Sequence, residues 1–343
     1  MLVFFSFSLP LSFWIGGGAG ACVGVRRFLV HVFSAACLIA SVFGLALADA
    51  RNHPGETFRK WVPHANGRTF QSLALLLDLP GHRATLEEAR MEAARVHALP
   101  RIREAVGDRS IDLLGHAQGV LLLNGLNWKP RPVFQGYTAY TPHLVGINAE
   151  HFRGPGAPAF VLLSPNVIDQ RLPTSDDGLV LLEVLKSYRP VLVERGYALF
   201  ARGPQTARAA PVAGRAHRLR AKCNERFSLP MMEGGVTVIQ ARIRHTFLGS
   251  LRGMLFRDAL VQIDLFFEDG TQRRYRLIPG QIRSGIPVSP LPGDVAGIVG
   301  LACGDPTPRV QAAAIVVRPR DAWAFESDVP ITVRTVPIPV HAR

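Results

Sequence analysis

The chain has 343 residues, of which 48% are hydrophobic and 19% are charged, and its formal net charge is +13. This composition is that of a folded protein with room for two domains, and it excludes an intrinsically disordered chain. Only four of the 39 basic residues are lysines, so 35 are arginines, a bias that indicates GC-rich coding DNA more than an anionic partner. Because no RNP motif, zinc-finger spacing or basic heptad accompanies the arginines, we expect no nucleic acid partner.

The first 50 residues, 1–50, are predicted to form a signal peptide or a membrane anchor. Two arginines precede an apolar run over 28–48, which ends in the small-residue pattern of a cleavage site. The run has 21 residues and is also long enough to span a bilayer if it is not cleaved. Residues 1–25 are either a first membrane helix or a leader before a true start at Val25. Each alternative places the rest of the chain in the periplasm, or anchored to the membrane and facing the periplasm.

Residues 51–202 are predicted to form an α/β layered domain, because apolar runs that suit strands alternate with stretches of helical spacing. Expected strands cover 110–114, 130–137, 157–164 and the two arms of a hairpin that turns at Arg195 and Gly196. Expected helices cover 85–99, 117–125, 142–152 and 176–188. The first of these helices is expected to begin with a capping box at Thr85 and to bury one apolar stripe.

The basic segment 203–227 is rich in Ala, Pro and Arg and is predicted to be a linker. Over 228–343 apolar and polar residues alternate, which is typical of a β-sandwich, here expected to be jelly-roll-like. Within this domain we expect a type I′ hairpin turn at Asp269 and Gly270, and a short helix or loop over 247–258.

Cys223 and Cys303 are the two cysteines of the predicted exported part. An oxidising compartment permits a disulfide between them, but a sequence does not fix the distance between two side chains. A disulfide and two separate buried thiols therefore both remain open.

The stretch GHAQG, residues 115–119, follows the predicted strand at 110–114. This is the outline of the nucleophile elbow of α/β-hydrolases, G-x-S-x-G, with Ala117 in place of the serine. Acyl transfer needs an oxygen or sulfur nucleophile, which a methyl group cannot supply. A catalytically dead α/β-hydrolase-like protein therefore remains as an alternative, and His116 is expected to be a structural residue.

The segment 127–152 combines aromatic, amide and hydroxyl side chains, which together suit a saccharide or another small polar ligand. The alternative is that they close a loop over the sheet. The ligand-binding candidates are Trp128, Gln135, Tyr137, Tyr140, His143 and Asn148. The segment 168–178 offers carboxylates that could act as an acid and a base, or could cap a helix and pair with surface arginines. These weak catalytic candidates are Asp169, Asp176 and Asp177.

We expect no cofactor and no metal. No P-loop and no G-x-G-x-x-G motif opens a helix, which argues against kinases, NTPases and nicotinamide-dependent enzymes. The histidines show no metal-binding spacing such as H-E-x-x-H.

Two stretches, NGLNWKPRPVFQGYTAYTP and IDQRLPTSDDG, resemble a family of uncharacterised bacterial envelope proteins. The motifs of that family are similar to N-G-L-N-x-x-P-R-P-V-F-Q-x-Y-x-A-Y-T-P and I-D-x-R-x-P-x-x-D-D-G, and the match covers about 105–200. Such segments are commonly the exported C-terminal region of polytopic membrane proteins, some of them glycosyltransferase-like. The resemblance implies an envelope location and a polytopic membrane protein as one possible partner, and it assigns no catalytic residue.

The sequence therefore predicts an extracytoplasmic cell-envelope protein that acts as a binding or scaffolding module, with a cell-surface saccharide as the expected ligand. The alternative is a glycan-processing enzyme, for glycosyl transfer or hydrolysis, that uses the aspartate carboxylates.

Overall fold

The computed structural model describes residues 31–35, 72, 75–203, 216–230, 235–256 and 258–341. The predicted signal peptide or anchor lies outside these residues, apart from 31–35, which are helical. Among the described residues, no helix has both the length and the apolar character needed to cross a membrane. The chain divides into two compact units, Met1–Ala89 and Arg90–Arg343.

Helix α4, Leu79–Val96, differs from its prediction in two respects. Thr85 lies inside the helix, where its hydroxyl donates to the carbonyl of Gly81 at 3.0 Å, so the predicted capping box is wrong. The predicted buried stripe is also wrong, because no residue of α4 is buried and Leu86 is 55% exposed. Two positions of the stripe, Ala89 and Ala93, are alanines, which offer little apolar area to bury. The last position of the stripe, Leu99, is buried but lies beyond the end of α4.

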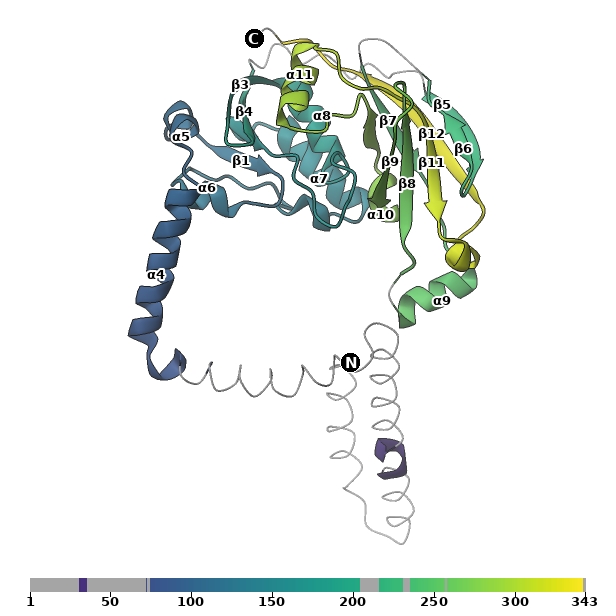
Figure 1. Cartoon of the computed structure of the whole chain (residues 1–343), viewed down its shortest axis with the longest axis horizontal. Helices are drawn as coiled ribbons and strands as arrows, with labels where there is room; N and C mark the ends of the chain where they lie inside the picture. The colour runs from purple at the N-terminus through teal and green to yellow at the C-terminus, as the bar shows by residue number, and fades with distance from the viewer. Residues whose placement is uncertain are drawn as a thin grey trace. The chain divides into compact units, whose positions relative to one another are not determined.

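In the described part of the second unit, a four-stranded sheet has the order β1-β2-β4-β3 (Figure 1). β1 and β2 are parallel, whereas the pairs β2–β4 and β4–β3 are antiparallel. The strands are β1 Ile111–Leu114, β2 Phe160–Leu163, β3 Tyr188–Glu194 and β4 Tyr197–Arg202. The helices of this half are α5 Pro100–Val106, α6 Gly119–Leu123, α7 Pro142–Arg153 and α8 Gly178–Ser187, with the 3-10 helix η1 at Gly136–Thr138. The predicted α/β domain is thus confirmed.

Apolar side chains cover both faces of this sheet. Leu113 of β1 and Leu162 of β2 pack on one face with residues of α5 and α6. Leu114 and Leu163, their neighbours along the strands, pack on the other face with α8. Because successive strand residues point to opposite faces, a continuous apolar run such as 160–163 suits a sheet covered on both sides.

The segment 130–137, predicted as a strand, is instead an irregular loop that leads into η1. Pro130 and Pro132 supply no backbone N–H to a strand ladder. The N–H and the carbonyl of Val133 bond to the side-chain amide of Asn148, at 2.8 and 2.9 Å. A side chain from α7 therefore takes the place of a neighbouring strand.

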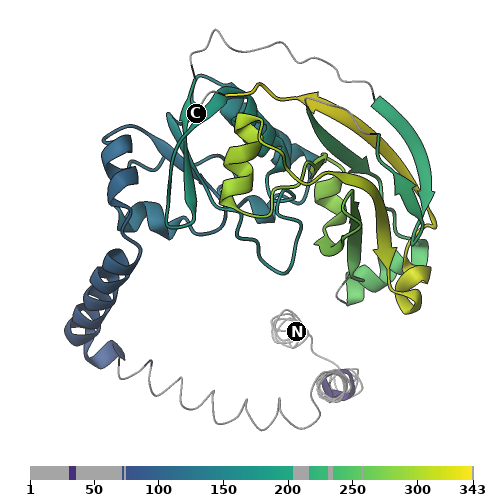
Figure 2. The same cartoon turned by 45° about the horizontal axis from the view of Figure 1, so that its top comes forward.

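In the described C-terminal part, eight strands form two four-stranded antiparallel sheets, in the orders β10-β7-β12-β5 and β6-β11-β8-β9 (Figure 2). Ile239, Ile263, Ile315 and Val333 come from both sheets and share one apolar core. The expected β-rich domain after the α/β domain is confirmed. The strands are β5 Ala216–Lys222, β6 Arg226–Ser228, β7 Gly235–Ala241, β8 Val261–Phe267, β9 Gln272–Leu277, β10 Ile286–Ser289, β11 Val310–Val317 and β12 Asp328–Pro337. The helices are α9 Phe247–Leu255, α10 Pro279–Ile282, α11 Val295–Cys303 and the 3-10 helix η3 Pro319–Ala324.

The linker predicted over 203–227 is wrong for its second half, which contains β5 and most of β6. β5 is an edge strand that pairs with β12, and most of its residues are at least partly exposed. Charged residues on an exposed edge strand discourage pairing with other chains. Only Leu219 and Ala221 of β5 pack against the core. The charged residues around them interrupt the apolar pattern by which a strand is predicted from the sequence.

The two predicted domains share a core. α11 belongs to the C-terminal part of the sequence, yet its Val295 and Ile298 pack with Leu163, Leu181 and Val184 of the α/β half. Backbone contacts also cross between the halves, since the N–H of Arg276 donates to the carbonyl of Gln170 at 2.8 Å. The boundary in the sequence therefore does not separate two independent bodies.

Two smaller predictions concern the turn of a hairpin and the cysteines. β8 and β9 form the expected hairpin. Gly270 has a φ of 82° but Asp269 is not in the positive-φ region, so the type I′ turn is wrong. Cys223 and Cys303 are free thiols, so the predicted alternative of a disulfide is not realised.

Candidate functional site

A cavity lies where the parallel strands β1 and β2 reach their carboxyl ends. Its walls come from the turns after both strands, from the loop before α8 and, through Pro292 and Ile298, from the C-terminal half. Ligands of α/β sheets commonly bind at this edge. The volume is about 40 Å³, which is room for about three water molecules. The cavity as it stands therefore accepts a small polar group rather than a whole sugar ring.

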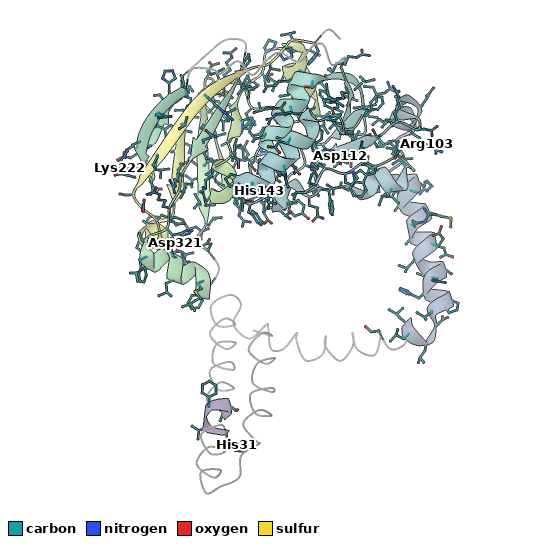
Figure 3. All side chains as sticks on the ribbon, turned by 180° about the vertical axis from the view of Figure 1, so that it is seen from behind. His31, Arg103, Asp112, His143, Lys222 and Asp321 are labelled. Atoms are coloured by element: carbon teal, nitrogen blue, oxygen red, sulfur yellow. The ribbon has the colours of Figure 1, made fainter. Side chains whose placement is uncertain are left out.

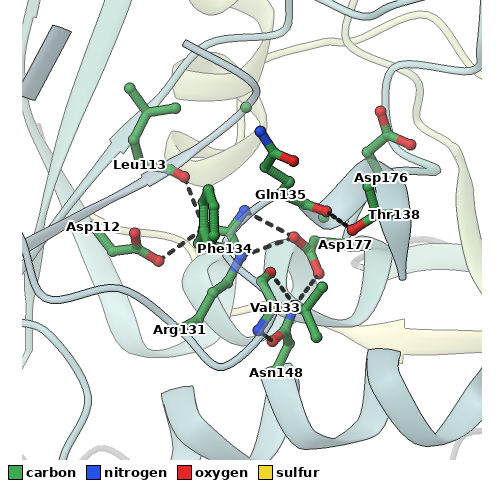
Figure 4. A network of polar contacts seen from close by, with 12 residues as sticks. Asp112, Leu113, Arg131, Val133, Phe134, Gln135, Thr138, Asn148, Asp176 and Asp177 are labelled. Carbon is green, nitrogen blue, oxygen red and sulfur yellow. Dashed lines mark hydrogen bonds and ion pairs between the residues drawn. The ribbon is translucent and has the colours of Figure 1, made fainter. Parts of the chain in front are cut away.

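Beside the cavity, Arg131 joins two aspartates in a buried network (Figure 4). Its Nη1 donates to Asp112 Oδ2 at 2.8 Å and to the carbonyl of Leu113 at 2.7 Å. Its Nε donates to Asp177 Oδ2 at 2.9 Å. Burial opposes the charge of the guanidinium, but Coulombic attraction and hydrogen bonds from Asp177 and Asp112 outweigh it, so the pKa of Arg131 lies above its usual value.

The remaining oxygens of both aspartates are also bonded. Trp128 Nε1 donates to Asp112 Oδ1 at 3.0 Å, and Asn148 Nδ2 donates to Asp177 Oδ1 at 2.8 Å. A methyl group at Gly136 would collide with the carboxylate of Asp177, so this approach requires glycine. Buried charges are tolerated where hydrogen bonds satisfy them in this way. The network ties together β1, the loop 130–137, α7 and the start of α8.

Asp176, next in the chain to Asp177, lines the cavity and has different partners. Its Oδ1 lies 3.2 Å from Arg171 Nη1 and 3.4 Å from Gln281 Nε2. Burial raises the pKa of Asp176, against the opposing effect of the Arg171 charge. Arg171 also donates to the carbonyl of Tyr137 at 2.9 Å, which positions this aromatic residue at the cavity wall.

Ser164 follows β2 directly and is one of the residues of the cavity wall, and its buried hydroxyl has no partner among the described residues. Ser164 as a whole is only 7% exposed. Buried polar atoms are normally hydrogen-bonded, so an unpartnered one points to a water molecule or a ligand. His116 lies in the same wall, with Nδ1 at 3.1 Å from the carbonyl of Asn166.

The turn after β1 has the strand–turn–helix outline that its sequence predicted. Gly115 has a φ of 149°, and a side chain there would press against Leu113. α6 then begins at Gly119. Ala117 carries no reactive atom, so this turn offers no nucleophile at the place of the elbow serine.

The six predicted ligand-binding residues do not converge on one point. Tyr137 lines the cavity. Trp128 and Asn148 belong to the Arg131 network, and the backbone carbonyl of Gln135 accepts a hydrogen bond from the Thr138 hydroxyl at 2.8 Å. Tyr140 is exposed, with its ring centroid 6.0 Å from the Arg171 guanidinium, and His143 is exposed on α7 (Figure 3).

The three predicted acidic residues also lie in different surroundings. Asp176 and Asp177 both line the cavity, but both oxygens of Asp177 are hydrogen-bonded within the Arg131 network. Asp169 is exposed and pairs with Arg276 at 2.8 Å. Among the described residues, no group of His, Cys, Asp or Glu side chains is arranged to hold a metal ion.

Sequence reasoning missed the residues that build the site, namely Asp112, Arg131, Ser164, Arg171 and Gln281. One signal was available. Asp112 stands inside the apolar run of β1, and a carboxylate at a fully covered sheet position needs a cationic partner.

No protein-family model matches the chain, and no curated protein matches it either. A search of solved structures finds a likeness to AlgX of Pseudomonas aeruginosa, with 11% sequence identity and a TM-score of 0.26. The alignment covers 67% of this chain and 50% of the AlgX chain, so the likeness spans half of that protein. A likeness this distant carries no argument about fold or function.

Proposed function

We propose that the protein is an extracytoplasmic binding module of the bacterial cell envelope. Its ligand is a small hydroxyl-rich group, such as the end of a cell-surface saccharide, and its site is the cavity at the carboxyl ends of β1 and β2. The observation that carries the proposal is Ser164, a residue of the cavity wall whose buried hydroxyl has no partner among the described residues.

The polar groups around the cavity suit a hydroxyl-bearing ligand. The Ser164 hydroxyl can donate and accept, and Asp176 accepts or, when protonated, donates. The Tyr137 ring adds an apolar surface against which the carbon face of a sugar can pack. The buried Arg131 network behind these groups fixes the loop 130–137 that leads to Tyr137, and rigid support of this kind favours precise binding.

The volume of the cavity supports an end-on mode of binding. A space for about three waters admits one hydroxyl or hydroxymethyl group of a saccharide, while the ring itself stays at the mouth.

We favour binding over the alternative of glycan processing because of the positions of the carboxylates. Glycosidases place two carboxyl groups on either side of one bond. Asp177 is enclosed with both oxygens bonded, and Asp169 pairs with Arg276 at the surface. Asp176 and Asp177 both line the cavity, but the oxygens of Asp177 are already bonded to Arg131 and Asn148, so the pair does not supply a free acid and a free base.

We further propose that the C-terminal half is a jelly roll. Numbered from β5 to β12 as one to eight, the sheet orders read 6-3-8-1 and 2-7-4-5. What supports the proposal is that the strands pair in a nested order, the first with the eighth, the second with the seventh, the third with the sixth and the fourth with the fifth, as in a jelly roll. An experimental structure with a different pairing of β10 or β6 would contradict it.

Isothermal titration calorimetry with a panel of monosaccharides and short oligosaccharides tests the proposed function. We expect one or more of them to bind, and Ser164→Ala to weaken binding about threefold to tenfold, which is the worth of one hydrogen bond. The matched control is Ser228→Ala, an exposed position of β6, which should leave affinity unchanged. Absence of binding across the panel, or equal affinity of the Ser164 variant, would contradict the proposal. Product formation that Asp176→Asn abolishes would favour the enzyme instead.

A further inference from the structure

Helix α9 presents its apolar side chains to the solvent. Five apolar residues recur at the spacing of one helix face, and each is exposed: Phe247 84%, Leu248 60%, Leu251 46%, Met254 85% and Leu255 64%. Phe256 directly after the helix and Trp323 in the neighbouring η3 are 72% and 51% exposed. These seven residues are named the α9 patch. Soluble proteins rarely leave a contiguous apolar surface of this kind uncovered.

The face of α9 that packs against the rest of the protein carries small side chains. Gly249 is buried, and a methyl group there would collide with the carbonyl oxygen of Ala324. Thr246 caps the helix by accepting from the Gly249 N–H at 3.0 Å, and its hydroxyl donates to the carbonyl of Trp323 at 2.9 Å. An amphipathic helix normally buries its apolar stripe. Helix α9 instead packs at the end of the β sheets through the face opposite its apolar stripe (Figure 1).

The surroundings of the α9 patch are positively charged. The described residues of the segments 242–258 and 318–326 include five arginines and three acidic residues. The acidic side chains already face basic ones. Asp321, which is labelled in Figure 3, lies 3.1 Å from Arg252 Nη1, and Glu326 lies 3.8 Å from Arg244 Nη1. Arg252 also lies over the Trp323 ring, with its guanidinium carbon 5.8 Å from the ring centroid. The net excess among the described residues is thus two positive charges at the rim of an apolar surface.

We infer that the α9 patch docks on the surface of a membrane that contains anionic lipids. An exposed apolar helix face with Phe, Leu and Trp, bordered by arginines, is suited to lie at the boundary between headgroups and acyl chains. The arginines complement the negative phosphates, and the indole of Trp323 suits the interface. The chain also contains the 21-residue apolar run 28–48, and two membrane contacts on one chain reinforce each other. The inference does not depend on the cavity or on its ligand.

Hydrogen–deuterium exchange of the full chain in nanodiscs tests this inference. Nanodiscs of phosphatidylglycerol and phosphatidylethanolamine are compared with nanodiscs of phosphatidylcholine alone. We expect the amides of 247–256 to exchange about tenfold more slowly in the anionic nanodiscs. Met254→Glu should abolish this protection, because it places a charge at the most exposed position of the α9 patch. Leu122→Glu, an exposed apolar residue of α6, is the matched control and should leave the protection unchanged.

Three outcomes would overturn the inference. Equal exchange rates in the two kinds of nanodisc would show that anionic lipid is not the partner. Protection that rises with protein concentration and not with lipid would assign the α9 patch to a second copy of the chain. Protection that is lost on deletion of 28–48 in lipid-free solution would assign it to that segment. Unchanged thermal unfolding of Met254→Glu confirms that the variant is folded.

Discussion

Arg131 Nη1 lies 2.8 Å from Asp112 Oδ2, and both side chains are almost completely buried, with exposures of 1% and 0%. On the other side of the guanidinium, Asp177 joins the same residue to the start of α8. Arg131 is therefore the point where three segments that are distant in the sequence meet. Desolvation offsets much of the attraction in such a network, but removal of one partner leaves an uncompensated buried charge.

Arg131→Met should destabilise the protein by about 3–5 kcal/mol, because Asp112 and Asp177 would face each other without a cation. Urea denaturation followed by circular dichroism measures this loss. Arg103→Met, an exposed position of α5, is the matched control, with an expected change within about 0.5 kcal/mol. A similar small effect for both variants would show that the network does not support the fold.

Gly136→Ala and Gly146→Ala should have opposite effects on the free energy of unfolding. A methyl group at Gly136 would collide with the carboxylate of Asp177, so we expect a loss of about 1–3 kcal/mol. A methyl group at Gly146, inside α7, meets no atom within 4 Å, so better helix propensity should stabilise the protein by about 0.5–1 kcal/mol. Denaturant titrations of both variants check the contrast in sign.

The pH dependence of the free energy of unfolding should reveal the raised pKa of the Asp176 carboxyl. Burial raises the pKa of its carboxyl above the usual 3.8, so the folded state holds the proton more tightly than the unfolded state. The resulting stabilisation is fully present below the unfolded pKa and is lost as pH rises through the folded pKa. Asp176→Asn should therefore gain stability relative to the wild type as pH rises from about 4 to about 7.

Asp269→Asn provides the control of opposite sign for this experiment. Hydrogen bonds from Thr271 hold the pKa of Asp269 below 3.8, so its contribution is present above the unfolded pKa and is lost as pH falls. Because the Asp269 contribution changes only at a pH near or below 3.8, urea titrations of both variants from about pH 2 to about pH 7 are needed to give the two slopes. Parallel slopes would contradict the assignment of a raised pKa to Asp176.

The shared core predicts that both halves unfold together. Ile298 of α11 is 4% exposed and packs in the same cluster as Leu163 of β2. Ile298→Ala should cost about 2–5 kcal/mol. In a variant in which Trp14 and Trp61 are replaced by phenylalanine, the fluorescence of Trp128 and Trp323 reports on the two halves. This fluorescence and far-ultraviolet circular dichroism should give one coincident transition. Two separate transitions would show that the halves are independent domains.

The order of the elements could be predicted from the sequence where the apolar pattern is local. β2 is a continuous apolar run, and the alternation around β8 and β9 predicted a hairpin correctly. The turn type was not predictable, since Asp269 adopts a negative φ in a longer loop than its dipeptide indicates. β5 was missed because it lies at an exposed edge, where arginines replace the apolar alternation.

The site was harder to predict than the fold because its residues meet through tertiary contacts. Tyr137 and Asp176 were found from their chemistry, and both line the cavity. Asn148 is a predicted ligand-binding residue, but its side-chain amide is hydrogen-bonded to the backbone of Val133 and to the carboxylate of Asp177. Arg131 could not be predicted as a site residue by itself, because the chain has many arginines. Only its partner Asp112, a carboxylate inside a buried strand, indicates that an arginine must lie nearby.

The most direct test of the binding site is a crystal structure of the protein soaked with the saccharide that binds most tightly in calorimetry. We expect a ligand oxygen at about 2.6–3.0 Å from Ser164 Oγ, between Tyr137 and Asp176. A saccharide bound elsewhere on the protein, with only water beside Ser164, would contradict it.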